Sequence, residues 1–156
     1  MKKLIFAGMA LALFQTDLTV KRQIEELPEG GGAYPLPGGF ADIERLHNHG
    51  LAGGGCTGHM TGIVRGTALA TAACAGFFLH LLTTPGQLIR TAGAAFLTGG
   101  ALSNLYDRCR RGYVVDYIRF HTPFKRLNRL VFNLADFFIF IGAVLICIGN
   151  GSHSQS

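Results

Sequence analysis

The most informative part of the chain is residues 99–136, which read GGALSNLYDRCRRGYVVDYIRFHTPFKRLNRLVFNLAD. It contains the end of one apolar segment, a short polar link and the start of a second apolar segment. A carboxylate at the edge of a hydrophobic medium is costly, so such residues are functional-site candidates. Two carboxyl groups placed close together share a proton, with their pKa values pushed apart, as an acid–base pair requires. The polar residues at these junctions are Asn104, Asp107, Asp116, Asn133 and Asp136.

The composition of the whole chain is that of a membrane protein. The 156 residues are 49% hydrophobic and only 15% charged, whereas soluble domains carry roughly 25% charged residues. The length fits a single domain over residues 1–156. The formal net charge is +5, but the basic residues flank apolar runs, so lipid headgroups are the expected counter-charges. The polar segments are short and poor in aromatic stacking residues, which argues against a nucleic-acid-binding protein.

The apolar runs predict an all-α membrane protein with four transmembrane helices and a small extracytoplasmic β/loop segment. The basic start Met1–Lys3 before an apolar run is also typical of a secretory signal peptide, but no small-residue cleavage site follows it. The third run is rich in Gly and Ala, which permits close helix packing in lipid. The predicted spans are about residues 4–20, 63–82, 88–106 and 133–149.

The segment between the first two spans, residues 22–62, is rich in Gly and Pro. This composition favours turns and extended chain over a packed core. Within it, Ile43–His47 is a candidate short amphipathic helix lying on the membrane. The histidines His47, His49 and His59 match no standard zinc spacing, so no metal site is predicted.

Counting the spans places the polar residues on one side of the membrane. The third span ends near Asp107 and the fourth begins near Asp136, so these two residues lie at similar depth. By the same count, Asp17, Asn48 and Asp116 are on that side too. The candidate residues therefore converge on one membrane face.

Asp17 and Lys21 are four residues apart, so on a helix they share a face and can form an ion pair. Two interpretations are open: an ion pair that anchors the end of the helix, which we favour, and a direct catalytic role.

The distribution of positive charge leaves the orientation open. The side that holds the N-terminus has Lys2, Lys3 and Arg90, and the other side has the remaining eleven of the fourteen Lys and Arg residues. The positive-inside rule counted over all loops puts the site side in the cytoplasm, whereas the basic start beside the first span argues the opposite.

The motifs GGALSNLYDR (99–108), RGYVVDYI (111–118) and FNLADF (132–137) resemble those of the lipoprotein signal peptidases, also called signal peptidase II. The resemblance covers most of the chain by layout and is densest over residues 99–142. It implies a four-span aspartyl protease of the bacterial inner membrane, with its active site near the outer face.

The resemblance also implies roles for individual residues. Asp116, which follows a Val-Val pair, and Asp136, which closes Phe-Asn-Leu-Ala-Asp, match the catalytic aspartates of the family. The positions that match supporting or substrate-binding residues are Asp17, Lys21, Asn48, Gly50, Asn104, Asp107, Arg108 and Asn133.

The chain departs from the family pattern at three places. Val20 stands where the family usually has a hydroxyl residue, and Ser103 replaces a common glycine. After Asn48-His49-Gly50 the chain reads Leu51–Gly53 instead of Ala-Phe. These changes leave both matched aspartates in place and concern the substrate pocket and the loop that covers it.

The matched residues predict an aspartic endopeptidase that needs neither a metal nor an organic cofactor. One ionised aspartate takes a proton from water, which attacks the scissile carbonyl, while the protonated aspartate polarises that carbonyl. By resemblance, the substrate is a prolipoprotein with a diacylglyceryl cysteine, cut just before that cysteine. The other expected partners are membrane lipids, and the protein is expected to be a monomer.

Two other function classes compete with this interpretation. The first is a catalytically inactive membrane scaffold of the same fold, suggested by the departures at Val20 and Gly53. The second is a small ion-coupled transporter that uses Asp17, Asp107 and Asp136 as coupling groups. Transporter sites favour the membrane midplane, whereas these carboxylates lie at span ends.

Overall fold

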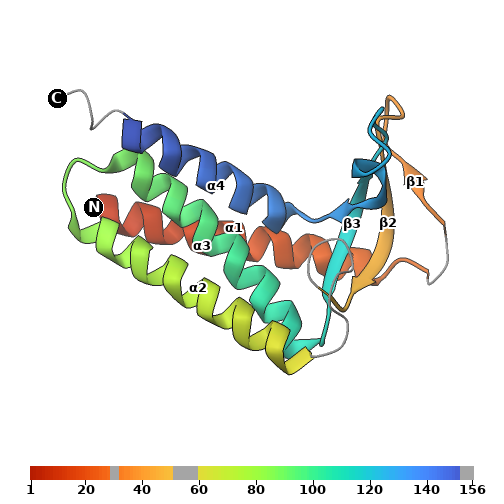
Figure 1. The fold of residues 1–156 in the computed structure, drawn as a ribbon, viewed down its shortest axis with the longest axis horizontal. Coiled ribbons are helices and arrows are strands. Elements are labelled where there is room, and N and C mark those ends of the chain that lie inside the picture. The colour runs from red at the N-terminus through yellow and green to blue at the C-terminus, as the bar shows by residue number, and fades with distance from the viewer. Residues whose placement is uncertain (29–31, 51–59, 152–156) are drawn as a thin grey trace.

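The structure, a computed structural model, describes residues 1–28, 32–50 and 60–151. Its described residues form four long helices, with a small sheet at one end of the bundle (Figure 1). Each predicted span lies almost entirely within one helix, so the prediction of four helices is confirmed. The helices are α1 (Lys2–Glu25), α2 (Met60–Thr83), α3 (Leu88–Arg110) and α4 (Leu134–Gly151).

Two of the helices, α1 and α2, are long and apolar enough to cross a membrane. Only 17% of the apolar window of each helix is buried within the protein, whereas the core helix of a soluble protein would be mostly covered. Large apolar side chains instead point outward, among them Leu4 and Leu69, which are 78% and 73% exposed. Such outward apolar faces fit lipid better than water.

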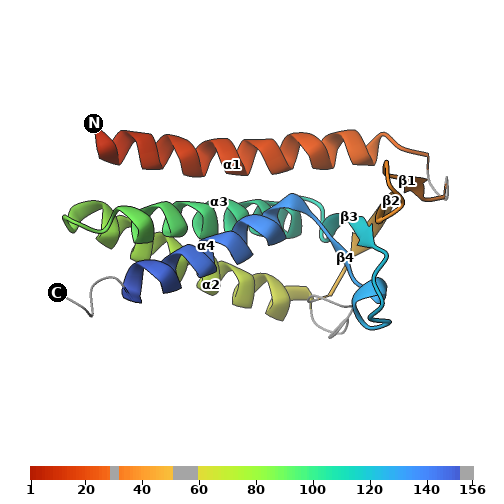
Figure 2. The same cartoon turned by 90° about the horizontal axis from the view of Figure 1, so that it is seen from above.

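Helix α3 packs against each of the other three helices, and Figure 2 shows α1 alongside it. Its glycines lie where neighbouring backbones come closest. A Cβ atom at Gly99 would lie 2.8 Å from the carbonyl oxygen of Ala10, and one at Gly100 would lie 2.5 Å from that of Ala135. The predicted close packing of the third span is therefore confirmed, and it depends on the absence of side chains there.

Gly100→Ala is expected to destabilise the protein by about 1–3 kcal/mol, because the added methyl group meets a backbone carbonyl that cannot rotate away. The matched control is Gly76→Ala in α2, where a Cβ atom would meet nothing within 4 Å. That control is expected to be neutral or to stabilise by about 0.5–1 kcal/mol, since alanine favours helix more than glycine does. Thermal unfolding in detergent measures both. Equal changes in unfolding temperature for the two variants would show that the close contact at Gly100 does not matter for stability.

The sheet is antiparallel, with strand order β1-β2-β3-β4, so the prediction of a small β/loop segment is confirmed. A short 3-10 helix, Leu127–Arg129, precedes the last strand. The strands are β1 (Tyr34–Pro35), β2 (Ala41–Asn48), β3 (Val114–Phe120) and β4 (Val131–Phe132).

The prediction of an amphipathic helix at Ile43–His47 is wrong, because these residues belong to β2. Strand β2 pairs with β3, about 70 residues further along the chain. Ile43 also packs beside the buried side chains of Ile24, Val115 and Tyr117. Non-local pairing of this kind overrides local periodicity.

Strand β3 directs alternate side chains to its two faces, as a strand must. Val115 and Tyr117 are buried in the apolar cluster that includes Ile24 of α1. Val114 and Asp116 face a cavity on the other side. The alternation of side chains along β3 thus places Asp116 in the cavity, while its neighbours Val115 and Tyr117 pack the strand against α1.

Candidate active site

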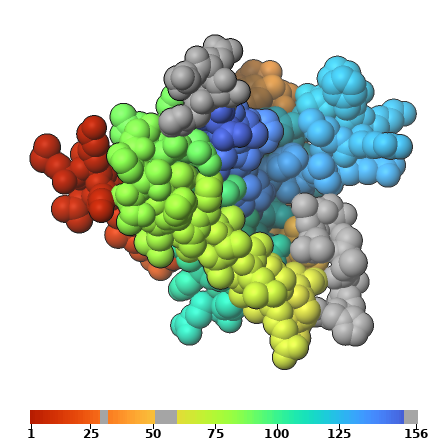
Figure 3. Space-filling view, turned by 60° about the vertical axis from the view of Figure 1, so that its left-hand side comes forward, coloured from red at the N-terminus to blue at the C-terminus, as the bar shows by residue number. Residues whose placement is uncertain are grey.

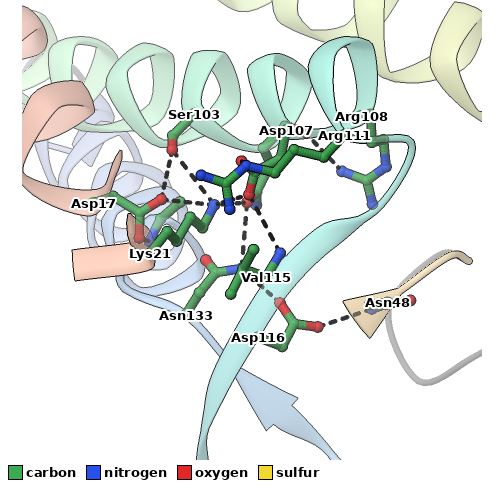
Figure 4. Close-up of polar contacts among 12 residues, drawn as sticks. Asp17, Lys21, Asn48, Ser103, Asp107, Arg108, Arg111, Val115, Asp116 and Asn133 are labelled. Atoms are coloured by element: carbon green, nitrogen blue, oxygen red, sulfur yellow. Dashed lines mark hydrogen bonds and ion pairs between the residues drawn. The ribbon is translucent and has the colours of Figure 1, made fainter. Parts of the chain in front are cut away.

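A buried lysine holds two aspartates at the junction of α1 and α3 (Figure 4). Lys21 is fully buried, and its Nζ lies 2.7 Å from Oδ2 of Asp17 and 3.0 Å from Oδ2 of Asp107. The predicted Asp17–Lys21 ion pair is therefore present, and Asp107 joins it from α3. Arg111 adds a further positive charge, with Nε 3.4 Å from Oδ1 of Asp107.

The carboxylate of Asp17 also ties α1 to the start of α4. Its Oδ2 accepts a hydrogen bond from Ser103 at 2.5 Å, and its Oδ1 accepts one from the backbone N–H of Ala135 at 3.0 Å. The Tyr117 hydroxyl donates to the same Oδ1 at 3.4 Å and accepts from the N–H of Leu134 at 3.1 Å. Asp17 therefore acts as an anchor between three helices and β3, as the favoured interpretation of the sequence expected.

Asn104 connects this ion cluster to Asp136. Lys21 donates to Oδ1 of Asn104 at 2.9 Å, and Nδ2 of Asn104 donates to Oδ1 of Asp136 at 3.1 Å. An ammonium group only donates, so the oxygen of the amide must face Lys21 and its nitrogen must face Asp136. The buried lysine thereby fixes the orientation of the Asn104 amide.

Asn133 connects Asp136 to Asp116. Its side-chain Nδ2 donates to Oδ1 of Asp116 at 2.7 Å and to Oδ1 of Asn104 at 3.3 Å. Its Oδ1 accepts from the N–H of Asp136 at 3.0 Å, and its own N–H donates to Oδ2 of Asp136 at 3.1 Å. This reciprocal pair resembles a capping box at the start of α4, where a negative charge is also favoured by the helix dipole.

The second oxygen of Asp116 is held from β2. Asn48 donates from Nδ2 to Oδ2 of Asp116 at 2.9 Å and accepts from the N–H of Gly50 at 3.0 Å. Arg108 donates to the carbonyl oxygens of Asn104 and Gly50, both at 3.3 Å. The structure thus brings together all ten residues predicted for the site, although they come from all parts of the chain.

Asp116 and Asp136 line one cavity of about 380 Å³. Asn48, Asn104, Arg108 and Asn133 supply the other polar groups of its wall. The remaining wall is apolar and comes from the start of β3, from β4 with the residue before it, and from one face of α4: Val114, Leu130, Val131, Phe132, Ile139, Phe140 and Ala143. Two carboxyl groups in an otherwise largely apolar cavity are suited to acid–base chemistry on a bound apolar substrate.

Burial raises the pKa of Asp116 from its ordinary value of 3.8 to about 6. The amide donors of Asn48 and Asn133 oppose this shift, and the charge of Asp136 adds to it. A carboxyl group with a raised pKa keeps its proton to a higher pH than an ordinary aspartate, as one member of an acid–base pair must.

This pKa predicts how stability and activity depend on pH. Between pH about 4 and 6 the folded protein binds the Asp116 proton more tightly than the unfolded chain, so the free energy of unfolding falls as the pH rises through this window. We also expect kcat/KM for cleavage to fall above pH about 6, because Asp116 then loses the proton that the pair needs to act as an acid. Thermal unfolding and cleavage measured from pH 4 to 8 test both effects. The Asp116→Asn variant is expected to lack this fall in the free energy of unfolding. A fall of equal size in that variant would show that Asp116 is not the group that titrates.

Two histidines of the polar segment, His47 and His49, contact the aromatic ring of Tyr113. His47 stacks on Tyr113 with ring centroids 4.0 Å apart, and His49 meets the same ring edge-on at 5.4 Å. Among the described residues, no group of three His, Cys, Asp or Glu side chains is placed to hold a metal ion. His59 lies outside the described residues.

A profile of the family described as Signal peptidase (SPase) II matches residues 9–150. The chain belongs to the signal peptidase II family. The lipoprotein signal peptidases of Brucella ovis and Brucella canis are each 41% identical to it over 111 residues, which is 70% of this chain. The match spans 66% of the length of these relatives, slightly less than two thirds. The resemblance in the sequence motifs is therefore confirmed.

Two solved structures share the fold of this signal peptidase II family member. Both are described as bacterial membrane enzyme structures obtained by the in meso method, at 2.3 Å and 1.9 Å resolution. The first has a TM-score of 0.80 and 26% identity, and covers 97% of this chain and 90% of its own. The second has a TM-score of 0.75 and 27% identity, and covers 92% of this chain and 90% of its own.

Sequence reasoning missed three side chains that bond to residues of the site, Ser103, Tyr117 and Arg111. Ser103 was noted only as a departure from the signal peptidase II pattern, yet it is fully buried and binds Asp17. Its position four residues before Asp107 puts both on one face of α3, and this spacing was an available signal. Of the other departures, Val20 packs beside the apolar cluster of Ile24, and residues 51–53 lie outside the described residues.

Proposed function

We propose that this chain is an aspartic endopeptidase of the lipoprotein signal peptidase type, which cuts prolipoproteins just before their diacylglyceryl cysteine and releases the signal peptide. The observation that carries the proposal is the shared cavity of Asp116 and Asp136. Two asparagines bridge the two carboxyl groups there, and a buried cation orients one of these asparagines. Membership of the signal peptidase II family and the names of the relatives support this substrate class.

In the proposed mechanism, Asp116 and Asp136 share one proton and act as a pair. The ionised carboxylate takes a proton from a water molecule, whose oxygen bonds to the scissile carbonyl carbon. The protonated carboxyl group donates to the carbonyl oxygen and so stabilises the negative charge that develops there. The tetrahedral intermediate then expels the amine of the cysteine, which takes a proton from the pair as the peptide C–N bond breaks.

Asn104 and Asn133 serve as positioning residues in this mechanism. Each donates a hydrogen bond to one carboxylate of the pair and so holds it in a single orientation. Asn48, the last residue of β2, holds the other oxygen of Asp116 and lines the cavity, and the N–H of Gly50 holds the Asn48 side chain in place. Arg108 binds the Gly50 carbonyl and fixes that edge to α3.

We place the chain in the bacterial inner membrane as one protease domain over residues 1–156, acting as a monomer without a cofactor. All four helices cross the bilayer in this proposal, with the N-terminus inside and the cavity near the outer face. The outward apolar side chains of α1 and α2 support membrane insertion. The lipid chains of the substrate then stay in the bilayer while the scissile bond reaches the two aspartates.

The test is a gel-shift assay with purified protein in detergent and a prolipoprotein that carries the diacylglyceryl cysteine. The expected result is a shorter product that keeps the lipidated cysteine at its new N-terminus, identified by mass spectrometry. The same prolipoprotein without the lipid is the control and is expected to be cut far more slowly. A folded protein that never cuts the lipidated substrate would overturn the proposal.

A further inference from the structure

A second cavity lies at the opposite end of the bundle from Asp116 and Asp136. It has a volume of about 340 Å³ and lies between the start of α1, the end of α2 and the start of α3. Figure 3 shows this end of the molecule, with the first residues of α1 (red) beside the α2–α3 turn (green). Nothing in the proposed proteolytic function uses this cavity.

The wall of the second cavity combines positive charge with apolar surface. Lys2 and Lys3 line it from the first turn of α1, and Thr84 and Gln87 contribute polar groups from the α2–α3 turn. The apolar lining includes Phe6, Leu82 and Leu88. Such a wall suits a molecule that has both an anionic group and a hydrocarbon part.

The positive charge of Lys2 and Lys3 has no side-chain carboxylate near it in the fold. No Asp or Glu occurs in residues 1–16, 49–106 or 137–156. These ranges contain the start of α1, all of α2, most of α3 and most of α4, and so every helical segment at this end of the bundle. The negative charges of the chain lie instead toward the sheet. No side-chain carboxylate at this end of the bundle therefore balances the two lysines, and an anionic headgroup from the membrane can supply the counter-charge.

The surroundings of the second cavity indicate that this counter-charge is part of a lipid. Beside it, Leu4, Ile5 and Leu88 are 78%, 61% and 50% exposed, so the cavity opens onto an apolar outer surface. A soluble anion would leave the apolar wall uncovered. A phospholipid places its phosphate at the lysines and its acyl chains against this surface.

We propose that this cavity binds one anionic phospholipid, with its phosphate between Lys2 and Lys3 and the start of an acyl chain against Phe6, Leu82 and Leu88. The site belongs to the leaflet on the N-terminal side of the protein. Its occupant would link α1 to the α2–α3 turn at the end of the bundle that has no sheet. The site is separate from the proteolytic cavity and does not depend on the proposed function.

The experiment compares lipid binding to the full chain in detergent micelles doped with phosphatidylglycerol or with phosphatidylcholine. The rise in unfolding temperature with lipid concentration gives an apparent affinity, and native mass spectrometry counts the lipid molecules retained. The test variant is Lys2→Gln/Lys3→Gln. The matched control is Lys125→Gln/Arg126→Gln, which removes the same charge from exposed residues between β3 and β4.

Each lysine near a lipid surface contributes roughly a fivefold change in binding, so loss of both is expected to weaken phosphatidylglycerol binding about 30-fold. The control variant is expected to bind phosphatidylglycerol as the parent does, and phosphatidylcholine is expected to bind weakly to all three proteins. Equal affinity of the two double variants for phosphatidylglycerol would overturn the proposal. Equal stabilisation by inorganic phosphate would also overturn it, since the site would then recognise a free anion.

A second variant tests the cavity itself at unchanged charge. Thr84→Trp places a large side chain in the space between the α2–α3 turn and the lysines. It is expected to reduce phosphatidylglycerol binding while Lys2 and Lys3 remain. Unfolding temperature without lipid and cleavage of the lipidated substrate show whether each variant is folded. Full phosphatidylglycerol binding by a folded Thr84→Trp protein would show that the lipid does not occupy the cavity.

Discussion

Asp116→Asn and Asp136→Asn are each expected to reduce cleavage of a diacylglyceryl prolipoprotein by about 10³-fold or more. Either change leaves a single carboxyl group, which cannot both accept a proton from water and donate one to the carbonyl. Because the two act as one unit, the double variant is expected to be no slower than the slower single variant. Initial rates over a range of enzyme concentrations measure the effect.

The matched control for this pair is Asp42→Asn on β2. Asp42 is an aspartate of the same sheet, and its partner is His121, with 2.8 Å between Oδ2 and Nε2. The control is expected to cleave at the rate of the parent. Folding of every variant is checked by thermal unfolding. If folded Asp116→Asn still cuts, the pair is wrongly assigned.

Lys21→Met is expected to be the most destabilising single substitution in the site. It keeps most of the side-chain volume but leaves Asp17 and Asp107 fully buried without their shared cation. Removal of one partner from a buried ion pair typically costs about 3–5 kcal/mol. Thermal unfolding in detergent measures the loss, and Lys125→Met, at an exposed lysine, is the control.

A second variant shows whether Lys21→Met loses stability because its buried carboxylates are left without a cation or because packing is lost. Lys21→Met/Asp107→Asn removes one negative charge together with the positive one and is expected to regain part of the stability lost in Lys21→Met. Cleavage is expected to stay low in both variants, since Asn104 loses the donor that fixes its amide toward Asp136. An unchanged unfolding temperature for Lys21→Met would show that the buried ion cluster does not hold α1 to α3.

The sequence predicted the parts of this structure that depend on local residue patterns and on the number of apolar spans between two residues. Apolar runs identified the four helices, and the alternation of spans brought Asp17, Asn48, Asp116 and Asp136 to the same end of the molecule. The four-residue spacing of Asp17 and Lys21 predicted their ion pair, because neighbours on one helix face need no tertiary information.

The missed parts depend on contacts between distant segments. Lys21 and Asp107 are separated by 86 residues, and no spacing rule relates them. The same holds for Tyr117 and Asp17, which are 100 residues apart. Ile43–His47 was assigned to a helix because its pairing with β3 is invisible in its own sequence. Local propensity is a weak guide where a partner strand decides the conformation.

The close glycine contacts of α3 also affect whether protons can pass through the helix bundle. A hydrolase in a membrane must draw water from one side without giving protons a route to the other. At Gly93 and Gly100 the backbones of α3 and α4 approach so closely that even a methyl group would overlap the carbonyl oxygen of Gly142 or Ala135. In the proposed membrane-spanning arrangement, a file of water molecules has no room along that seam, so water can reach the two aspartates from one side without opening a path for protons across the bilayer.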